Sequence, residues 1–292
     1  MSPCPVCGGE TENAFSVGDR NRALSDATFE YRRCTSCGTY HLAHPPADLG
    51  RYYSADDYEP PAPEELDRCA QAETPRLRLL APFATAGRLI DIGAAYGIFA
   101  RAARDAGFEV TAIEMDERCC DYLERVVGVR AIRSSGPQRA LPGLEPARAI
   151  TLWHVLEHLP QPQEVLAAAA ERLESGGALV IATPNPDSLQ FRLLGARWAH
   201  VDAPRHLFLF PLAALSDQAR RLGLRLAHVT TNDPAGRQWN RFGWEYALRG
   251  CPARRPSTRA LWTLSLAMAA LLGPVERRGM HGATYTATFV KP

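Results

Sequence analysis

Residues 89–116, with the sequence LIDIGAAYGIFARAARDAGFEVTAIEMD, decide the fold of this chain. The stretch opens with a short apolar run followed by turn residues, a pattern that predicts a strand buried on both faces. The small residues between Gly93 and Gly97 let the backbone approach a ligand closely, and the next helix directs its N-terminal N–H groups at the same place. A second predicted strand ends in Glu114, about twenty residues after Gly93, where an acid accepts hydrogen bonds from ribose hydroxyls. We therefore predict a βαβ unit that binds a nucleoside.

The glycine spacing separates two families that use such a unit. A dinucleotide fingerprint requires G-x-G-x-x-G, whereas this loop reads G-x-x-x-G with Asp91 two residues before the first glycine. The sequence DIGAAYG resembles the first motif of class I S-adenosylmethionine (SAM) methyltransferases, D/E-x-G-x-G-x-G. Ala95 replaces the middle glycine, which costs little where the backbone φ is negative. A tight strand–helix turn without a ligand is the alternative explanation of this loop.

Later segments extend the resemblance. WHVLEHL follows the fourth predicted strand at residues 153–159, TPN follows the fifth at 183–185, and PRHLFLF occupies 204–210. In this order they resemble the class I methyltransferases related to the ubiquinone O-methyltransferases, over about residues 83–231 and the last predicted strand. The resemblance implies an α/β fold with a seven-stranded, doubly wound, Rossmann-like sheet and SAM as cofactor. It also implies a small-molecule acceptor, such as a sugar, a polyketide or a peptide natural product, with O-methylation favoured.

The same resemblance implies cofactor contacts at the carboxyl ends of the strands, where open α/β sheets bind ligands. The cofactor-binding candidates are Asp91, Gly93, Ala94, Ala95, Gly97, Glu114, Met115, Ser135, Trp153 and His154. Relatives often carry an acid near the position of Ser135 for the adenine amino group, and this chain has serines there instead.

Two C-x-x-C-G motifs, at residues 4–8 and 34–38, predict a metal site. Zn²⁺ takes four soft ligands in a tetrahedron, and two tight turns that each present a pair of thiolates supply them. Strand-like segments lie between and after the motifs, as in a zinc ribbon. The predicted ligands of a structural zinc are therefore Cys4, Cys7, Cys34 and Cys37. A redox role is the alternative, but neither motif has the sequence context of a thioredoxin-like βαβ unit.

The chain is predicted to have three parts. Residues 1–45 form the zinc ribbon, residues 46–82 a linker with a lead-in helix, and residues 83–292 the methyltransferase domain. Within the linker, YYSADDY at 52–58 is a candidate lid over the cofactor or, alternatively, a packing segment. An insertion at about 233–281 contains an apolar helix, which is a candidate cap, homodimer contact or membrane-surface element.

The composition is that of an ordinary soluble protein, with 46% hydrophobic and 22% charged residues. A formal net charge of +1 gives no overall attraction to nucleic acid or to an anionic membrane. Every basic residue except Lys291 is an arginine, which together with the many alanines indicates a G+C-rich bacterial gene. No signal peptide follows Met1, and the longest apolar run is too short to span a bilayer. We therefore expect a cytoplasmic biosynthetic enzyme whose cysteines are thiols or metal ligands.

Methyl transfer from a sulfonium is an in-line displacement, so the enzyme must align the nucleophile and, for a hydroxyl, accept its proton. Histidine is suited to this task near neutral pH. His158 follows the fourth strand and His206 lies in PRHLFLF; each is a candidate base or, alternatively, a hydrogen-bonded structural histidine. We slightly favour His206, because the neighbouring Arg205 is placed to orient an acceptor and to keep the imidazole neutral.

Three other functions compete with this one. Some RNA base methyltransferases also carry a cysteine-rich zinc module, but the near-zero net charge and the lack of a dense basic stripe argue against nucleic acid. A non-catalytic SAM-binding protein whose ribbon docks a partner is disfavoured by the intact set of Asp91, Gly93, Gly97 and Glu114. The segment HVLEH at 154–158 fits the inverted zincin pattern H-x-x-E-H, but zincin helices are long, and Pro160 interrupts the chain here.

Overall fold

The computed structural model describes residues 3–53, 59–249 and 258–292. The chain forms two compact units, each assembled from separate segments. The first, here called the cysteine unit, comprises Met1–Ser54, Thr183–Leu215 and Thr230–Thr286. The second, here called the Rossmann unit, comprises Ala55–Ala182, Ser216–Val229 and Ala287–Pro292.

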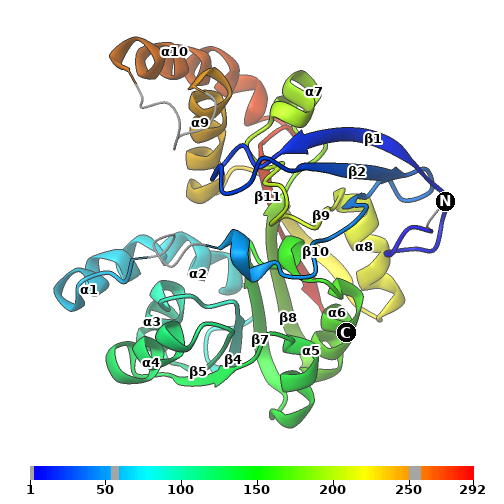
Figure 1. The fold of residues 1–292 in the computed structure, drawn as a ribbon. Coiled ribbons are helices and arrows are strands. Elements are labelled where there is room, and N and C mark those ends of the chain that lie inside the picture. The colour runs from blue at the N-terminus through cyan, green and yellow to red at the C-terminus, as the bar shows by residue number, and fades with distance from the viewer. Residues whose placement is uncertain (1–2, 54–58, 250–257) are drawn as a thin grey trace. The chain divides into compact units, whose positions relative to one another are not determined.

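A seven-stranded sheet with the order β10-β11-β8-β7-β4-β5-β6 carries the Rossmann unit (Figure 1). Its strands are β4 (Gly87–Ile92), β5 (Phe108–Glu114), β6 (Arg130–Arg133), β7 (Ala147–Trp153), β8 (Leu173–Pro184), β10 (Arg225–Thr230) and β11 (Thr284–Val290). The pairs β4–β5, β5–β6, β4–β7 and β7–β8 are parallel. The chain runs outward from β4 to β6 and then returns to β7 on the other side of β4. This reversal makes a topological switch point at β4 and β7, where sheets of this kind bind ligands. The predicted doubly wound sheet is confirmed.

The central strands are apolar because helices cover them. Leu89 of β4 and Val110 of β5 lie in one core with Phe99 and Ala103 of α3 (Ile98–Asp105), whose alanines allow close packing on the sheet. The other helical segments of this unit are α4 (Glu117–Tyr122), η3 (Leu123–Val127), α5 (Pro137–Ala140), η4 (Leu141–Gly143), η5 (Leu156–His158), α6 (Pro162–Arg172) and most of α8 (Leu212–Arg221). The core therefore sits directly beneath the switch point.

The lead-in segment forms two helices where one was expected. α1 spans Pro63–Ala72 and α2 spans Thr74–Leu80, with Glu73 between them. Pro75 lies in the first turn of α2, where it has no N–H group to continue the hydrogen-bond ladder of α1. Leu66 of α1 and Leu80 of α2 both pack in the core with α3.

A four-stranded antiparallel sheet, in the order β1-β2-β3-β9, organises the cysteine unit. The predicted ribbon supplies β1 (Thr11–Gly18), β2 (Thr28–Cys34) and β3 (Tyr40–Leu42). The fourth strand, β9 (Phe208–Leu209), comes from PRHLFLF, and its Leu209 pairs with Tyr40. The sheet of the ribbon is thus completed by a strand from far along the chain.

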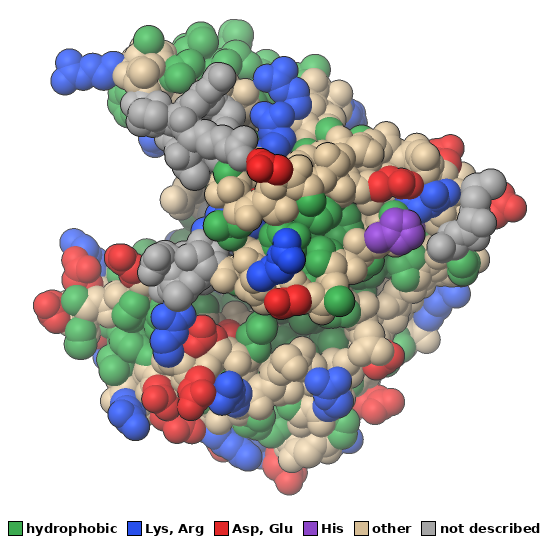
Figure 2. Space-filling model, in the orientation of Figure 1, with side chains coloured by type: hydrophobic (Ala, Val, Ile, Leu, Met, Phe, Trp, Pro, Cys, Tyr) green, Lys and Arg blue, Asp and Glu red, His purple; other side chains and the backbone are tan. Residues whose placement is uncertain are grey.

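The remaining helical segments of the cysteine unit are η1 (Gly50–Tyr52), α7 (Leu189–Leu194), η6 (Gly195–Arg197), α9 (Pro234–Arg249) and α10 (Arg259–Glu276). In the candidate lid, Tyr52 is buried with its ring 5.8 Å from that of Phe29, and residues 54–58 lie outside the described residues. Within the described part of the chain, no helix is long and apolar enough to cross a membrane. Basic and acidic side chains are interspersed over the face shown in Figure 2, in keeping with the net charge of +1.

Candidate functional site

Glu114 ends β5, and its carboxylate joins the ends of two neighbouring strands. The N–H of Ala95, in the loop after β4, donates to Oε2 over 2.8 Å. The N–H groups of Met115 and Asp116 donate to Oε1 over 2.7 and 3.1 Å. Because an ionised carboxylate offers about four acceptor positions, these bonds orient the group and leave acceptor capacity for the hydroxyls of a ligand. The acid predicted for the ribose is therefore held against the glycine loop.

The two glycines of this loop are required for packing. Gly93 and Gly97 both have a φ of +71°, in the left-handed region that favours glycine. A Cβ atom at Gly93 would clash with the side chain of Val155, and one at Gly97 would clash with that of Leu123. The sequence suggested close approach to a ligand as the reason for these glycines, and the structure adds close contact with neighbouring side chains.

Two residues without the freedom of glycine adopt left-handed conformations at adjacent strand ends. Ala95, after β4, has a φ of +48°, and His154, after β7, has a φ of +59°. The condition under which Ala95 would replace glycine at little cost is therefore not met, since this conformation costs about 1–2 kcal/mol for an L-residue. The same conformation lets the N–H of Ala95 donate to Glu114. Backbone strain of this kind concentrates at functional sites.

Asp91 is buried in the middle of the sheet, and its carboxyl is not an ordinary surface acid. The hydroxyl of Thr151 on β7 donates to Oδ1 over 2.6 Å. Burial raises the pKa of Asp91 to about 7, and the nearby Glu73 and Glu114 also raise it, against the opposing effects of Thr151 and Arg76. A cation bound beside this carboxyl would favour its ionised form.

Two residues that no sequence pattern indicated, Arg76 and Glu73, lie next to predicted cofactor residues. The guanidinium carbon of Arg76 lies 4.7 Å from the centroid of a Trp153 ring, and Nη1 lies 2.7 Å from Oε2 of Glu73. The indole N–H of Trp153 is buried and finds no acceptor among the described residues. Arg76 lies in the short helix α2, and nothing in the sequence of that helix connects it with the glycine loop.

The other predicted cofactor residues differ in their surroundings. Ala94 is half-buried in the loop, the Met115 side chain is 59% exposed, and Ser135 is exposed on a turn. Nδ1 of His154 lies 3.5 Å from Oε1 of Glu157. Hydrogen bonds thus bring Ala95, Glu114 and Met115 together, and Ser135 lies outside this set. The segment after β7 is the single 3₁₀ turn η5 (Leu156–His158), so the long helix of an inverted zincin is absent from these residues.

The four cysteines of the predicted zinc ribbon meet at one point. Their sulfur atoms all lie within 4.8 Å of one another. The Sγ atoms of Cys4 and Cys37 are 3.9 Å apart, and those of Cys7 and Cys34 are 3.4 Å apart. A tetrahedron with Zn–S bonds of about 2.3 Å has sulfur atoms about 3.8 Å apart. The four cysteines are free of disulfides, and Gly8 and Gly38 complete both turns with a φ of +75°. The donor set fits a tetrahedral zinc.

Backbone groups favour thiolate at one of these cysteines. Burial raises the pKa of Cys34, but the N–H groups of Cys37 and Ser36 and the neighbouring thiols outweigh it and lower the value to about 6. The N–H of Cys37 lies 3.4 Å from its sulfur. Burial raises the pKa of Cys4. A thiolate is the form that binds a metal, so these N–H groups favour the metal-binding form of Cys34.

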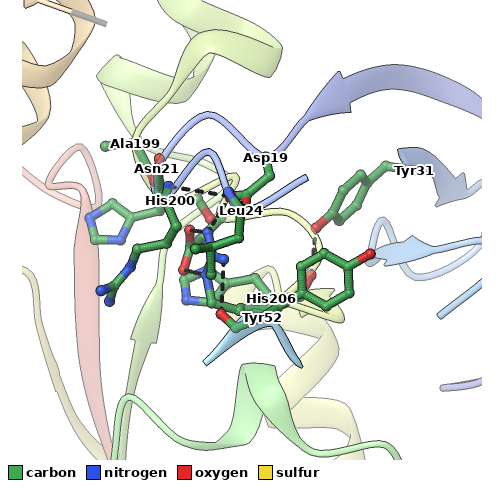
Figure 3. A network of polar contacts seen from close by, with 11 residues as sticks. Asp19, Asn21, Leu24, Tyr31, Tyr52, Ala199, His200 and His206 are labelled. Atoms are coloured by element: carbon green, nitrogen blue, oxygen red, sulfur yellow. Dashed lines mark hydrogen bonds and ion pairs between the residues drawn. The ribbon is translucent and has the colours of Figure 1, made fainter. Parts of the chain in front are cut away.

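Arg205 is the centre of a buried polar network in the cysteine unit (Figure 3). Its guanidinium donates to Oδ1 of Asp19 over 2.8 Å, and to both carboxylate oxygens of Asp202 over 2.6 and 2.9 Å. A further N–H reaches the carbonyl oxygen of Tyr52 at 3.2 Å. Burial lowers the pKa of Arg205, but hydrogen bonds and charges from Asp202 and Asp19 raise it by more. The guanidinium is therefore held by carboxylates of the protein itself.

His206 is buried beside this network, and its backbone and ring are both hydrogen-bonded. Nδ1 lies 2.7 Å from the carbonyl oxygen of His200, and the hydroxyl of Tyr31 donates to the His206 carbonyl over 2.6 Å. A carbonyl oxygen only accepts, so Nδ1 carries the proton and Nε2 is the basic nitrogen of the neutral ring. His158, in the Rossmann unit, is half-buried at the end of η5.

Comparison with known proteins agrees with this fold. A family model described as "Methyltransferase domain" matches residues 65–229, more than half of the chain. Ubiquinone biosynthesis O-methyltransferases from Saccharophagus degradans and Bordetella avium are 28% and 29% identical over 154 and 180 residues, which cover 49% and 56% of this chain and 65% and 70% of those proteins. The chain thus spans about two thirds of the length of these curated relatives. A SAM-dependent methyltransferase from Archaeoglobus fulgidus has a similar fold, with a TM-score of 0.51 and 16% identity over 76% of this chain and 94% of that one.

The sheet, the switch point and the family match define a class I SAM-dependent methyltransferase. The chain belongs to the methyltransferase-domain family, which supports SAM as its methyl donor. The resemblance stated from the glycine loop is thereby confirmed.

Proposed function

We propose that this enzyme transfers the methyl group of SAM to a hydroxyl of a small molecule. The observation that carries the proposal is the Glu114 carboxylate, held by the Ala95 N–H at the carboxyl ends of β4 and β5. Two relatives named ubiquinone biosynthesis O-methyltransferases support O-methylation. A sugar, polyketide or peptide natural product remains the proposed class of acceptor.

The residues of the Rossmann unit fit the ribose and the methionine end of SAM. Glu114 is proposed to accept the ribose hydroxyls, and the loop from Gly93 to Gly97 to lie against the ligand. Asp91, with its raised pKa, suits the ammonium of the methionine end, and Arg76 suits its carboxylate. The unsatisfied indole N–H of Trp153 offers a further donor. When bound, SAM supplies an electrophilic methyl group on a sulfonium.

The proton of the acceptor hydroxyl is proposed to pass to His206 or to His158. The tautomer of His206, with its proton on Nδ1, presents a basic Nε2, which favours this residue. Arg205 is bound to Asp19 and Asp202, which supports a positioning role for the segment that carries His206. The proposal that Arg205 orients the acceptor stays a prediction.

Zinc bound by Cys4, Cys7, Cys34 and Cys37 is proposed to be structural. Four thiolates complete the tetrahedron and leave no position for a substrate. The metal would then tie the turn before β1 to the turn between β2 and β3. Residues 83–292 remain the proposed methyltransferase domain.

The test is a methyl-transfer assay on a panel of phenolic, sugar and peptide acceptors. Release of S-adenosylhomocysteine and a mass gain of one methylene identify the acceptor class. On that acceptor, replacement of the true base by alanine lowers turnover about 100- to 10,000-fold with SAM affinity retained. Near-native turnover of both His206→Ala and His158→Ala would show that neither is the base. Methylation confined to amines or to RNA would contradict the proposed acceptor.

A further inference from the structure

Helix α10 (Arg259–Glu276) carries apolar side chains on its exposed side. Its buried positions are Ser265, Gly273 and Glu276. An exposed stripe with helical spacing consists of Ala260, Leu264, Ala267, Leu271 and Val275, and Leu271 is 76% exposed. Hydrophobic side chains cluster over α10 in Figure 2. A helix that is hydrophobic all round requires a second apolar environment.

Buried polar bonds, and not the exposed stripe, hold α10 on the cysteine unit. Oε1 of Glu276 accepts from Nε2 of Gln190 over 2.8 Å and from the indole N–H of Trp244 over 2.9 Å. α10 also packs against α9. The position of the helix is therefore set without the stripe, whose side chains are left for another contact.

The part of the sequence that contains this helix is rich in arginine. Between residues 234 and 278 there are eight arginines and two glutamates, a formal charge of +6, so the rest of the chain carries −5 of the total of +1. Arg237 and Arg241 on α9, Arg259 at the start of α10, and Arg277 and Arg278 after its end are all exposed. Of the two glutamates, Glu276 has a buried side chain and does not contribute to the exposed surface. The near-zero net charge of the whole chain conceals this basic segment.

We propose that the α9–α10 pair binds the surface of an anionic lipid membrane, with α10 lying in the plane of the interface. An interfacial helix combines a strong apolar face with arginines at its margins. No charged residue occurs between Arg259 and Glu276, so the apolar face is continuous along the helix. Each arginine near an anionic surface adds to the attraction.

Trp262 lies beside the apolar stripe of α10, where the helix would meet the boundary between lipid and water. Its side chain is 45% exposed, and the guanidinium carbon of Arg241 is 5.9 Å from the centroid of its ring. Tryptophan prefers the boundary between lipid and water, because one part of the ring is apolar and its N–H is polar. The pair thus places an aromatic and a cationic group together beside the stripe.

A second copy of the chain is the other occupant of an apolar face, and charge argues against it. Two surfaces of the same strong positive sign repel each other on self-association, whereas an anionic lipid surface attracts both. The proposal goes beyond methyl transfer and does not depend on it.

The experiment is flotation of the full chain with vesicles of phosphatidylcholine, with or without phosphatidylglycerol. We expect binding to the anionic vesicles that falls with added salt, and little binding to the neutral ones. The double change Leu264→Glu and Leu271→Glu should weaken binding at least about tenfold, because it puts acids into the apolar stripe and removes buried area. Arg277→Gln with Arg278→Gln should weaken it several-fold.

Leu193→Glu is the matched control, since Leu193 is 61% exposed on α7, outside the stripe. It should leave vesicle binding unchanged. Equal binding of wild type and the double leucine variant would overturn the proposal. So would a stable dimer, measured by sedimentation, that the leucine changes dissociate while no vesicle binding is seen.

Discussion

Glu114 and Arg205 are both charged residues with buried side chains held by several hydrogen bonds, yet their partners come from different distances along the chain. The carboxylate of Glu114 accepts from Ala95 and from the two residues that follow it. The guanidinium of Arg205 bonds to Asp19 and to Tyr52, which lie in the N-terminal segment. The first set is contained in one βαβ unit, whose local pattern predicts it. The second depends on a fold that brings distant segments together.

Loss of a metal ligand should have the largest effect on stability, and this effect should distinguish the zinc ribbon from the Rossmann unit. Cys34→Ser should abolish zinc binding and unfold the ribbon of residues 1–45, because metal binding to such sites contributes about 10–16 kcal/mol in small zinc peptides. The SAM affinity of the Rossmann unit should persist. Metal analysis and calorimetry with SAM test both parts, and Cys69→Ser, a free cysteine outside the cluster, is the control. Full zinc content in Cys34→Ser would contradict the site.

Arg205→Leu should have the next largest effect. Asp19 and Asp202 would keep their carboxylates without the buried cation that balances them, and breaking a buried ion pair from one side costs about 3–5 kcal/mol. Denaturant unfolding measures the loss. Arg220→Leu removes an exposed ion pair with Asp217 and should change stability by less than about 1 kcal/mol. Equal losses of stability in the two variants would show that the buried network stabilises the protein no more than the exposed ion pair does.

Asp91→Asn should make the stability of the Rossmann unit less sensitive to pH. The folded-state pKa of Asp91 is about 7, above its ordinary value of 3.8, so the folded protein binds the extra proton between these values. The stability contributed by the neutral carboxyl is present below about pH 4 and is lost as pH rises through about 7. Without ligand, the free energy of unfolding of the asparagine variant should therefore rise relative to that of the wild type between about pH 4 and pH 7, by about 2–4 kcal/mol at most. Parallel pH profiles of thermal unfolding for both proteins would contradict the raised pKa.

Glu114→Ala should have the smallest of these effects, measured on ligand binding. Loss of the ribose acceptor leaves hydroxyls and N–H groups unpaired, which costs about 1–3 kcal/mol of SAM affinity by calorimetry. Glu117→Ala, three residues on and exposed, removes an ion pair with Arg133 and should leave affinity unchanged. Wild-type affinity in Glu114→Ala would discard the predicted ribose site.

The sequence predicts the Rossmann unit well because its signals are local. Strand, loop, helix and acid follow one another between Leu89 and Asp116, and each is recognised by apolar runs and small residues of that segment. The left-handed conformation of Ala95 was not predicted. Its conformational cost is offset by a hydrogen bond to Glu114 at the end of the neighbouring strand, which the local sequence does not show. Arg76 escaped it as well, because a helix that precedes the sheet reaches Trp153 only in the folded protein.

By itself, the sequence determined the class of the enzyme, the nucleoside loop and the four cysteines that meet in one cluster. These rest on short patterns whose spacing restricts the geometry, such as a C-x-x-C turn or a βαβ unit. Only the tertiary structure decided that PRHLFLF pairs with the ribbon through Leu209 and Tyr40, and that Arg205 binds Asp19. A strand edge or a buried charge can pair with any suitable group that the fold places next to it. A local sequence pattern therefore does not predict which group that is. The fold selects it by burying both groups together, since an unpaired charge or strand edge in that place would cost more.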